Sequence, residues 1–208
     1  DCLLSRGLGD VYKRQVYDKL LLPQDSPLRK AVVISNPLGE DFSIMRTISL
    51  NGMLTSLSTN FNRRNKNVRL YELGNIYLPK QVPVTELPEE RMQFTLGMYG
   101  EGDFFTMKGV IEEFLYKAGM KLKPEYDPEA GKPFLHPGRQ ANVVYDGTVI
   151  GYLGEVHPTV AANYAIKERV YVAVLDMPEI VSRASFDHKY EGIAKFPAAA
   201  RDISMVVP

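Results

Sequence analysis

Four side chains that can hold or exchange protons gather between residues 134 and 158: His136, Arg139, Glu155 and His157. Histidine exchanges protons near neutral pH and a glutamate can orient it, so this set suggests a small His-dependent hydrolase. Each of these histidines precedes a proline, however, which favours extended backbone and suits a turn or a helix cap. No serine or cysteine lies in a nucleophile-elbow context, and the spacing is poor for a metal. The sequence favours a structural role, with hydrolysis as the alternative.

The same stretch contains Gly151 and Gly154, which could suggest a phosphate-binding loop. Their spacing is not that of the Gly-x-Gly-x-x-Gly fingerprint, and they lie inside a predicted strand. Glycines within a strand usually mark a bulge or a close approach of two backbones. We therefore predict that these glycines serve packing.

A second group of candidates is basic. Arg63, Arg64, Lys66 and Arg69 follow an apolar helical stripe, and positive charge at a helix C-terminus opposes the partial negative charge of its unpaired carbonyls. Helix capping is the simpler interpretation of this cluster at residues 63–69. The alternative is an RNA-binding module that contacts phosphates.

Composition limits the class of protein. The 208 residues contain 25 Lys plus Arg and 25 Asp plus Glu, so the net charge of zero offers no general attraction to nucleic acid or to an anionic membrane. The single cysteine, Cys2, excludes an internal disulfide framework. No apolar run reaches the length of a membrane span. These features predict a soluble, cytoplasmic protein.

The elements that would position these residues mix strands and helices without strict βαβ alternation, which favours a largely antiparallel α+β sheet. We expect strands at 31–35, 68–78, 91–100 and 169–176, and a hairpin at 141–156 turned by Asp146-Gly147. Helices are expected after Ser43, Asn51, Thr106, Pro158 and Asp176, each at a cap or first helical position.

Both ends of the chain differ from its middle. Residues 1–15 have no helix or strand period and resemble translated adapter sequence, so we predict a non-native leader that is not part of the fold. Lys195-Phe196-Pro197 marks a boundary, after which one strand of a further domain begins. The predicted division is a leader at 1–15, a core at 16–192 and a truncated domain at 193–208.

Several motifs in order resemble the bacterial phenylalanyl-tRNA synthetase beta subunit from about residue 26 to residue 208. They are "SNPLGEDFSIMRTISLNGMLTSLSTNFNRRNKNVRLYELGNIY", "TMKGVIEEFL", "LHPGRQANV", "GYLGEVHPTV", "VYVAVLD" and "KFPAAARDISMVV". The resemblance implies a class II aminoacyl-tRNA synthetase-like core without catalysis, with a mainly antiparallel sheet flanked by helices. It also implies that the segment from Ile193 is the first strand of a truncated ferredoxin-like anticodon-binding domain.

The resemblance carries expectations about partners and cofactors. It implies an alpha subunit, in a heterotetramer of two alpha and two beta chains, and tRNA bound by the complete enzyme. ATP and magnesium serve the whole enzyme, and none is expected in this fragment. The family's editing and metal-binding domains have no counterpart in these residues. Ala200 replaces an arginine that usually precedes Arg201-Asp202, which leaves RNA contact by Arg201 an open expectation.

The ATP-binding pattern of class II synthetases is broken in this sequence. Those enzymes use an Arg-x-Glu strand, in which period two places both side chains on one face. Here the spacing is Arg69-Leu-Tyr-Glu72, which places them on opposite faces unless the strand has a bulge. The family's later ATP-site arginine is also missing after Gly154, since no arginine follows before Arg169. We predict a catalytically silent core.

The segment from Ser43 to Arg64 matches the family region that helps to build a helical bundle between subunits. Its predicted contact residues for the alpha subunit are apolar except for one arginine: Met45, Arg46, Met53, Leu54, Leu57 and Phe61. Met53 is the preferred contact, because methionine suits a surface that adapts to a partner. For Leu57 and Phe61, packing on the chain's own sheet is the alternative. The predicted RNA contacts are Arg63, Arg64, Lys66 and Arg201.

Overall fold

The computed structural model describes residues 11, 12, 15–37, 39, 43–185, 202, 204 and 205. The predicted truncated domain at 193–208 therefore lies almost wholly outside the described residues. The elements, in chain order, are β1 (Val11–Tyr12), α1 (Val16–Lys19), the 3₁₀ turn η3 (Pro27–Arg29), β2 (Ile44–Met45), α2 (Leu50–Asn62), β3 (Val68–Leu78), β4 (Glu89–Tyr99), α3 (Phe104–Lys117), β5 (Glu125–Asp127), β6 (Leu135–Tyr145), β7 (Thr148–Val156), α4 (Pro158–Asn163), β8 (Val170–Asp176) and α5 (Met177–Val181).

A six-stranded sheet organises the fold, with the strand order β3-β4-β8-β7-β6-β5. Every neighbouring pair in it is antiparallel. This confirms the predicted α+β class with an antiparallel sheet. The strands β1 and β2 form a separate two-stranded ladder.

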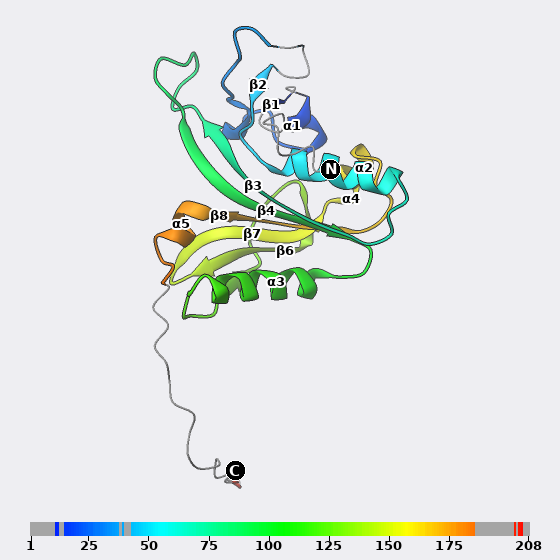
Figure 1. Ribbon diagram of the computed structural model, residues 1–208, viewed down its shortest axis with the longest axis vertical. Helices are drawn as coiled ribbons and strands as arrows, with labels where there is room; N and C mark the ends of the chain where they lie inside the picture. Colours follow the sequence, from blue (N-terminus) through cyan, green and yellow to red (C-terminus); the bar gives the residue numbers. More distant parts are fainter. Residues whose placement is uncertain are drawn as a thin grey trace.

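Helices cover both faces of the sheet, as Figure 1 shows, with α1, α2 and α4 above it and α3 below it. The alternation of strand side chains explains the two cores, because successive residues point to opposite faces. On β4, Leu96 and Met98 pack in the cluster that contains α3, whereas Tyr99 packs in the cluster that contains α2. The sheet thus separates two apolar layers.

The predicted hairpin is confirmed, and it is longer than expected because β6 begins at Leu135. Asp146 and Gly147 connect β6 to β7, with φ angles of 49° and 72°. Both values lie in the left-handed region that a type I′ hairpin turn requires. The strand that begins at Val170 and the helix that begins at Pro158 are also where the sequence predicts them.

The helix starts differ from the predictions in their caps. Helix α2 begins at Leu50, one residue before the predicted cap Asn51, and Ser49 occupies the N-cap position. Helix α3 is capped by Asp103, and the predicted cap Thr106 is its partner in a capping box. Thr106 N donates to Asp103 Oδ1 over 2.8 Å, and Asp103 N donates to Thr106 Oγ1 over 3.2 Å. The hydrogen bonds that the backbone N and the hydroxyl of Thr106 donate to the Asp103 carboxylate lower the pKa of Asp103.

Three predictions for the N-terminal region are wrong. The expected strand at 31–35 is reduced to a single bridge between Val33 and Ile44, because its pairing partner β2 is only two residues long. The expected helical turn after Ser43 is instead strand β2. The predicted leader at 1–15 extends too far, because residues 11 and 12 form β1 and pair with β2. Residues 1–10 lie outside the described part.

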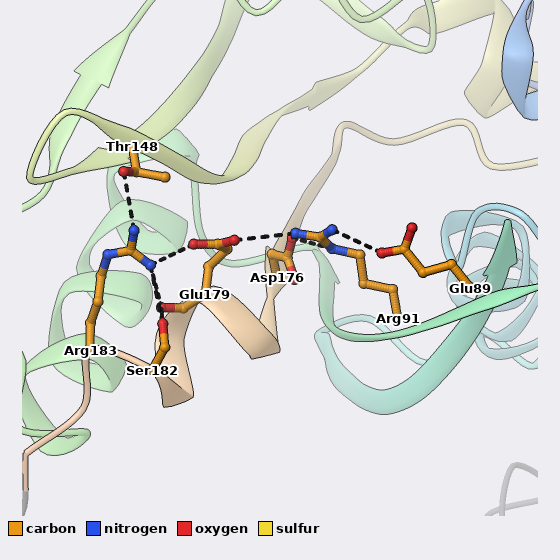
Figure 2. A network of polar contacts seen from close by, with 7 residues as sticks. All are labelled: Glu89, Arg91, Thr148, Asp176, Glu179, Ser182 and Arg183. Atoms are coloured by element: carbon orange, nitrogen blue, oxygen red, sulfur yellow. Dashed lines mark hydrogen bonds and ion pairs between the residues drawn. The ribbon is translucent and has the colours of Figure 1, made fainter. Parts of the chain in front are cut away.

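A network of ions joins α5 to the sheet at one end (Figure 2). Arg91 of β4 donates from Nε to Asp176 Oδ2 over 2.6 Å, and its guanidinium also pairs with Glu89 and Glu179. Arg183 donates to Glu179 over 2.5 Å and to Thr148 Oγ1 over 3.2 Å. The hydrogen bond that Arg91 donates to Asp176 raises the pKa of Arg91. The network fixes α5 against β4 and β7.

Among the helices that the structure describes, none combines the length and apolar character that a membrane span needs.

Candidate functional site

The two predicted histidines each use a ring nitrogen to hold the backbone. His136 Nδ1 accepts a hydrogen bond from Gly138 N over 3.1 Å. His157 Nδ1 accepts from Thr159 N over 3.2 Å and thereby caps α4, which confirms its predicted place at the helix start. In each ring, Nδ1 holds the backbone two residues further along the chain. The local role of both rings is therefore structural.

Arg139 and Glu155 lie close together, but Glu155 binds Arg139 and does not orient a histidine. Arg139 Nη1 donates to both oxygens of Glu155, over 3.0 and 2.9 Å, and Arg169 Nε lies 3.9 Å from the same carboxylate. The Glu155 side chain is only 5% exposed, whereas the two arginines are largely exposed. A buried carboxylate held by two guanidinium groups is an ion pair, and it does not orient a histidine.

A cavity of about 550 Å³ lies around this ion pair, between β6, β7, α4 and the loop before β8. His136 and Arg139 line one side of it, and Ala161 and Ile166 line another. Sequence reasoning missed Lys167 and Arg169, which also line it. Their only signal was their charge, since they are remote from the histidines along the chain. The cavity combines cationic side chains with the paired carboxylate of Glu155 and the exposed carboxylate of Glu168, and no serine, threonine or cysteine is among the described residues that line it.

The glycines of this stretch serve backbone packing, as predicted. A Cβ on Gly151 would lie 2.4 Å from the carbonyl oxygen of Val174, on the neighbouring strand β8. One on Gly154 would lie 2.7 Å from the carbonyl oxygen of Arg139. Only glycine allows this approach, so the pair provides no phosphate-binding loop.

The broken Arg-x-Glu pattern is confirmed in strand β3. Its ladder with β4 runs from Val68 to Leu78 without a register shift, so no bulge brings Arg69 and Glu72 to the same face. Arg69 is exposed and donates to the carbonyl oxygen of Glu101 over 3.3 Å. Glu72 points to the other face, where Arg46 Nη1 donates to it over 2.6 Å. The two side chains cannot hold one phosphate group together.

Arg46 is not a subunit contact, which corrects the prediction for this residue. It is 1% exposed and lies between β2 and β3. Its Nε donates to the carbonyl oxygen of Asn75 over 2.6 Å, in addition to the Glu72 bond, and its own carbonyl accepts from Tyr77 N over 2.8 Å. A buried guanidinium needs such partners. Arg46 therefore ties the segment before α2 to strand β3.

Most of the predicted apolar stripe on α2 is likewise internal. Met53, Leu54 and Leu57 are at most 1% exposed. Met53 packs onto the sheet at Gly97, where a Cβ would lie 2.7 Å from the Met53 sulfur. The choice of Met53 as the preferred alpha-subunit contact is wrong, because a glycine opposite the helix lets the side chain fill the chain's own core. For Leu57, packing on the sheet is confirmed.

Met45 and Phe61 keep part of their surface. Both are half-buried, and the Phe61 ring meets the Tyr99 ring edge-on with centroids 5.8 Å apart. These are the two residues of the predicted interface set with remaining accessible surface.

The sheet face below α2 also contains a cavity of about 510 Å³, lined by apolar side chains such as Ile48, Ile76 and Phe134 together with Gln93 and Lys132. Close to it, Ser49 Oγ bonds Gln93 Oε1 over 2.7 Å. On this face, Glu72 is already bound by Arg46. The ATP-binding clamp of a class II synthetase would need an unpaired glutamate with an arginine two residues away on the same face. The residues present do not fit ATP.

The basic cluster is exposed. Arg63, Arg64 and Lys66 follow α2 and Arg69 lies at the start of β3, all with solvent-accessible side chains. Arg201, the fourth predicted RNA contact, lies outside the described residues. In the part of the chain that the structure describes, no three His, Cys, Asp or Glu side chains are grouped so that they could hold a metal ion.

Comparison with known families identifies the fold. The family model described as "Phenylalanyl tRNA synthetase beta chain CLM domain" matches residues 11–177. The chain belongs to the phenylalanyl-tRNA synthetase beta chain family. The match begins at the residue where the first strand begins, which agrees with the corrected N-terminal boundary.

Two curated relatives extend this finding along the sequence. The phenylalanine–tRNA ligase beta subunit of Clostridium acetobutylicum is 42% identical over 212 positions, which cover 100% of this chain and 26% of that protein. The beta subunit of Clostridium tetani is 41% identical over 193 positions, which cover 93% of this chain and 24% of that protein. The chain thus spans about a quarter of the length of these relatives.

Among solved structures, pyrrolysyl-tRNA synthetase from Desulfitobacterium hafniense has the same fold, with a TM-score of 0.64. The match covers 83% of this chain and 60% of that protein, at 12% sequence identity. The similarity at this level concerns the fold of a tRNA synthetase and not its chemistry.

Proposed function

We propose that this chain is a catalytically silent, class II-like core of a phenylalanine–tRNA ligase beta subunit, and that it serves as a scaffold for the alpha subunit. The proposal rests on the family and on one structural observation. Glu72 is bound by Arg46 on one face of β3, while Arg69 lies on the other face. A strand in this state keeps the synthetase fold without its phosphate clamp.

In the complete enzyme, ATP and magnesium would support the joining of phenylalanine to its tRNA, with the catalytic groups outside this core. The expected assembly is two alpha and two beta subunits in the cytoplasm. The Arg46–Glu72 pair and the cores on both faces of the sheet would hold a rigid surface for that assembly.

The most exposed apolar surface of the sheet suggests where the alpha subunit binds. On the α3 side of the outer strand β3, Tyr71 is 69% exposed and Leu73 is 55% exposed, and Met92 on β4 is 44% exposed. Tyr71 contacts Phe94, whose ring packs on Phe114 of α3. Contiguous exposed apolar side chains of this kind mark protein contacts. We therefore place the alpha-subunit contact on this strip, with Met45 as the alternative site retained from the sequence.

The silent-core proposal is tested by phenylalanine-dependent exchange of pyrophosphate into ATP. The purified chain should give no exchange, and Arg69→Ala should change nothing. The assembled alpha–beta enzyme, assayed in parallel, is the positive control. Exchange by the chain alone that disappears in Arg69→Ala would overturn the proposal.

The scaffold proposal is tested by co-purification with the alpha subunit. Leu73→Glu should block assembly while the chain keeps its circular dichroism spectrum, because the side chain is already in water. Met45→Glu distinguishes the alternative site. If both variants stay folded and assemble normally, neither surface is the interface.

A further inference from the structure

One end of the six-stranded sheet gathers residues that are remote in sequence. The register places Val68 of β3 opposite Tyr99 of β4, and Tyr99 opposite Val170 of β8. On the other side of β8, its next residue Tyr171 pairs with Glu155 of β7, and Val156 pairs with Leu135 of β6. Residues that flank this row on five strands therefore lie at the same end of the sheet.

The residues that flank this row are rich in cations. We call them the basic sheet end, and its members are Arg63, Arg64, Lys66, Arg69, Arg139, Lys167 and Arg169, all of them exposed. The hydrogen bond from Tyr99 Oη to the carbonyl oxygen of Asn65, over 2.8 Å, fixes the loop after α2 at this end. The cavity beside Glu155 opens between its members Arg139, Lys167 and Arg169.

The positive charge at this end is poorly neutralised. Within the described ranges, Arg63, Arg64, Lys66 and Lys167 make no ion pair, and none of them has an interaction left unstated. Arg139 and Arg169 share a single carboxylate, that of Glu155. At the α5 end, by contrast, Arg91 and Arg183 are both paired with carboxylates, those of Glu89, Asp176 and Glu179.

We infer that the basic sheet end is a contact surface for the phosphate backbone of RNA. The inference rests on the proposed function, which makes tRNA the polyanion that the complete enzyme handles. Strands about 4.8 Å apart spread the cations over roughly 19 Å from β3 to β6, so several phosphates can be met at once. Contacts of this kind position a nucleic acid and read no sequence.

Two features favour RNA over an acidic protein. Lysine is depleted in protein interfaces, whose centre is apolar, whereas Lys66 and Lys167 belong to a surface on which cations outnumber the nearby carboxylates of Glu101, Glu155 and Glu168. In addition, Phe105 in the first turn of α3 is 71% exposed and follows the loop that leaves β4 at this end. An exposed ring beside cations offers a platform for base stacking.

The test measures binding of a fluorescein-labelled phenylalanine tRNA transcript by anisotropy over a series of salt concentrations. The test variant is Lys66→Gln combined with Lys167→Gln, because both side chains are exposed and neither makes an ion pair within the described residues. Arg139 is left intact, since it neutralises the buried Glu155. The matched control is Lys80→Gln combined with Lys121→Gln, which removes the same charge from exposed positions outside the basic sheet end.

Each lost phosphate contact should lower the slope of log affinity against log salt by about 0.7 to 0.9. We expect the test variant to lose between one and two units of slope and roughly tenfold in affinity near 0.1 M salt, with the control nearly unchanged. Equal loss in both variants, or no loss in either, would overturn the inference. Tighter binding of fluorescein-labelled polyglutamate than of the transcript would overturn RNA as the partner. Failure of the proposed function would appear separately, in alpha-subunit assembly.

Discussion

The two ends of the sheet use arginine in different ways. At the α5 end, Arg91 and Arg183 are surrounded by Glu89, Asp176 and Glu179 within hydrogen-bonding distance (Figure 2). At the basic sheet end, the exposed cations outnumber the carboxylates beside them, and Glu155 is shared by two arginines. The ion pairs at the α5 end join elements of the same chain. The excess of cations at the basic sheet end leaves positive charge available for a molecule outside the chain.

The register explains the paired end. Gln93 of β4 lies opposite Asp176 of β8, so Arg91, two residues before Gln93 on the same face, reaches the start of α5. Two carboxylates at the other end have different tasks, because Asp103 caps α3 and Glu155 is buried. Carboxylates therefore pair with arginines at the α5 end because the strand register brings them together, whereas Asp103 and Glu155 at the other end serve a helix cap and a buried pair.

The largest effect is expected at the paired end, from Arg91→Met. This change leaves Asp176, whose Oδ1 is already buried without a hydrogen-bond partner, beside two further carboxylates. We expect a loss of about 2 kcal/mol in the free energy of unfolding, measured with urea and circular dichroism. The control is Lys80→Met, which removes only an exposed pair with Glu86 and should cost less than about 0.5 kcal/mol. Equal losses would mean that the network does not hold α5.

An intermediate effect is expected around Glu155, and it should be asymmetric. Arg139→Met leaves a buried carboxylate with only the distant Arg169, so about 1–2 kcal/mol should be lost. Glu155→Gln leaves two exposed arginines that water can solvate, so its cost should be smaller. The two variants are compared by urea unfolding. A larger loss in Glu155→Gln would show that Arg139 depends on the pair more than Glu155 does.

Sequence patterns predicted the regular parts of the fold well. Alternation identified β3 and β4, and Asp146-Gly147 identified the hairpin, because these signals are local. The strand expected at 31–35 failed because pairing depends on a partner, and β2 is only two residues long. The predicted N-cap of α2, Asn51, was also wrong. Ser49 occupies the N-cap position, and its hydroxyl hydrogen-bonds to the side chains of Gln93 and Thr95 on β4, which are remote in sequence.

The candidate site was harder to predict. The odd spacing of Arg69 and Glu72 was sufficient to place them on opposite faces, since strand periodicity is exact over a few residues. The burial of Arg46 and Met53 was not predictable from the same segment, because it depends on Glu72 and Gly97 on other elements. The sequence identified only the cluster at 63–69 of the basic sheet end, because Arg139, Lys167 and Arg169 lie far from it along the chain and join it through the sheet register.

A smaller effect is expected from the carboxylate that caps α3. Hydrogen bonds from Thr106 lower the pKa of Asp103, so its contribution is present above the unfolded value and is lost as the pH falls through the lower folded value. The difference in melting temperature between the natural chain and Asp103→Ala should therefore shrink in acid, below about pH 4. The melting temperature of Asp103→Asn, which keeps a capping oxygen, should lie between those of the natural chain and Asp103→Ala at neutral pH. A difference that stays constant with pH would contradict a role for the charge.

The smallest effect on stability is expected from the cations that the basic sheet end leaves unpaired. Lys66→Gln combined with Lys167→Gln removes charge from a surface with an excess of positive charge, so the free energy of unfolding should stay within about 0.5 kcal/mol and rise slightly at low salt. The control, Lys80→Gln with Lys121→Gln, breaks the Lys80–Glu86 pair, so its free energy of unfolding should fall slightly instead. Both differences should fade in high salt, where the screening length is only about 3 Å at 1 M. Urea unfolding at low and high salt measures them. A loss above about 1 kcal/mol in the first variant would show that these cations hold the fold, as those at the α5 end do, and are not free for a partner.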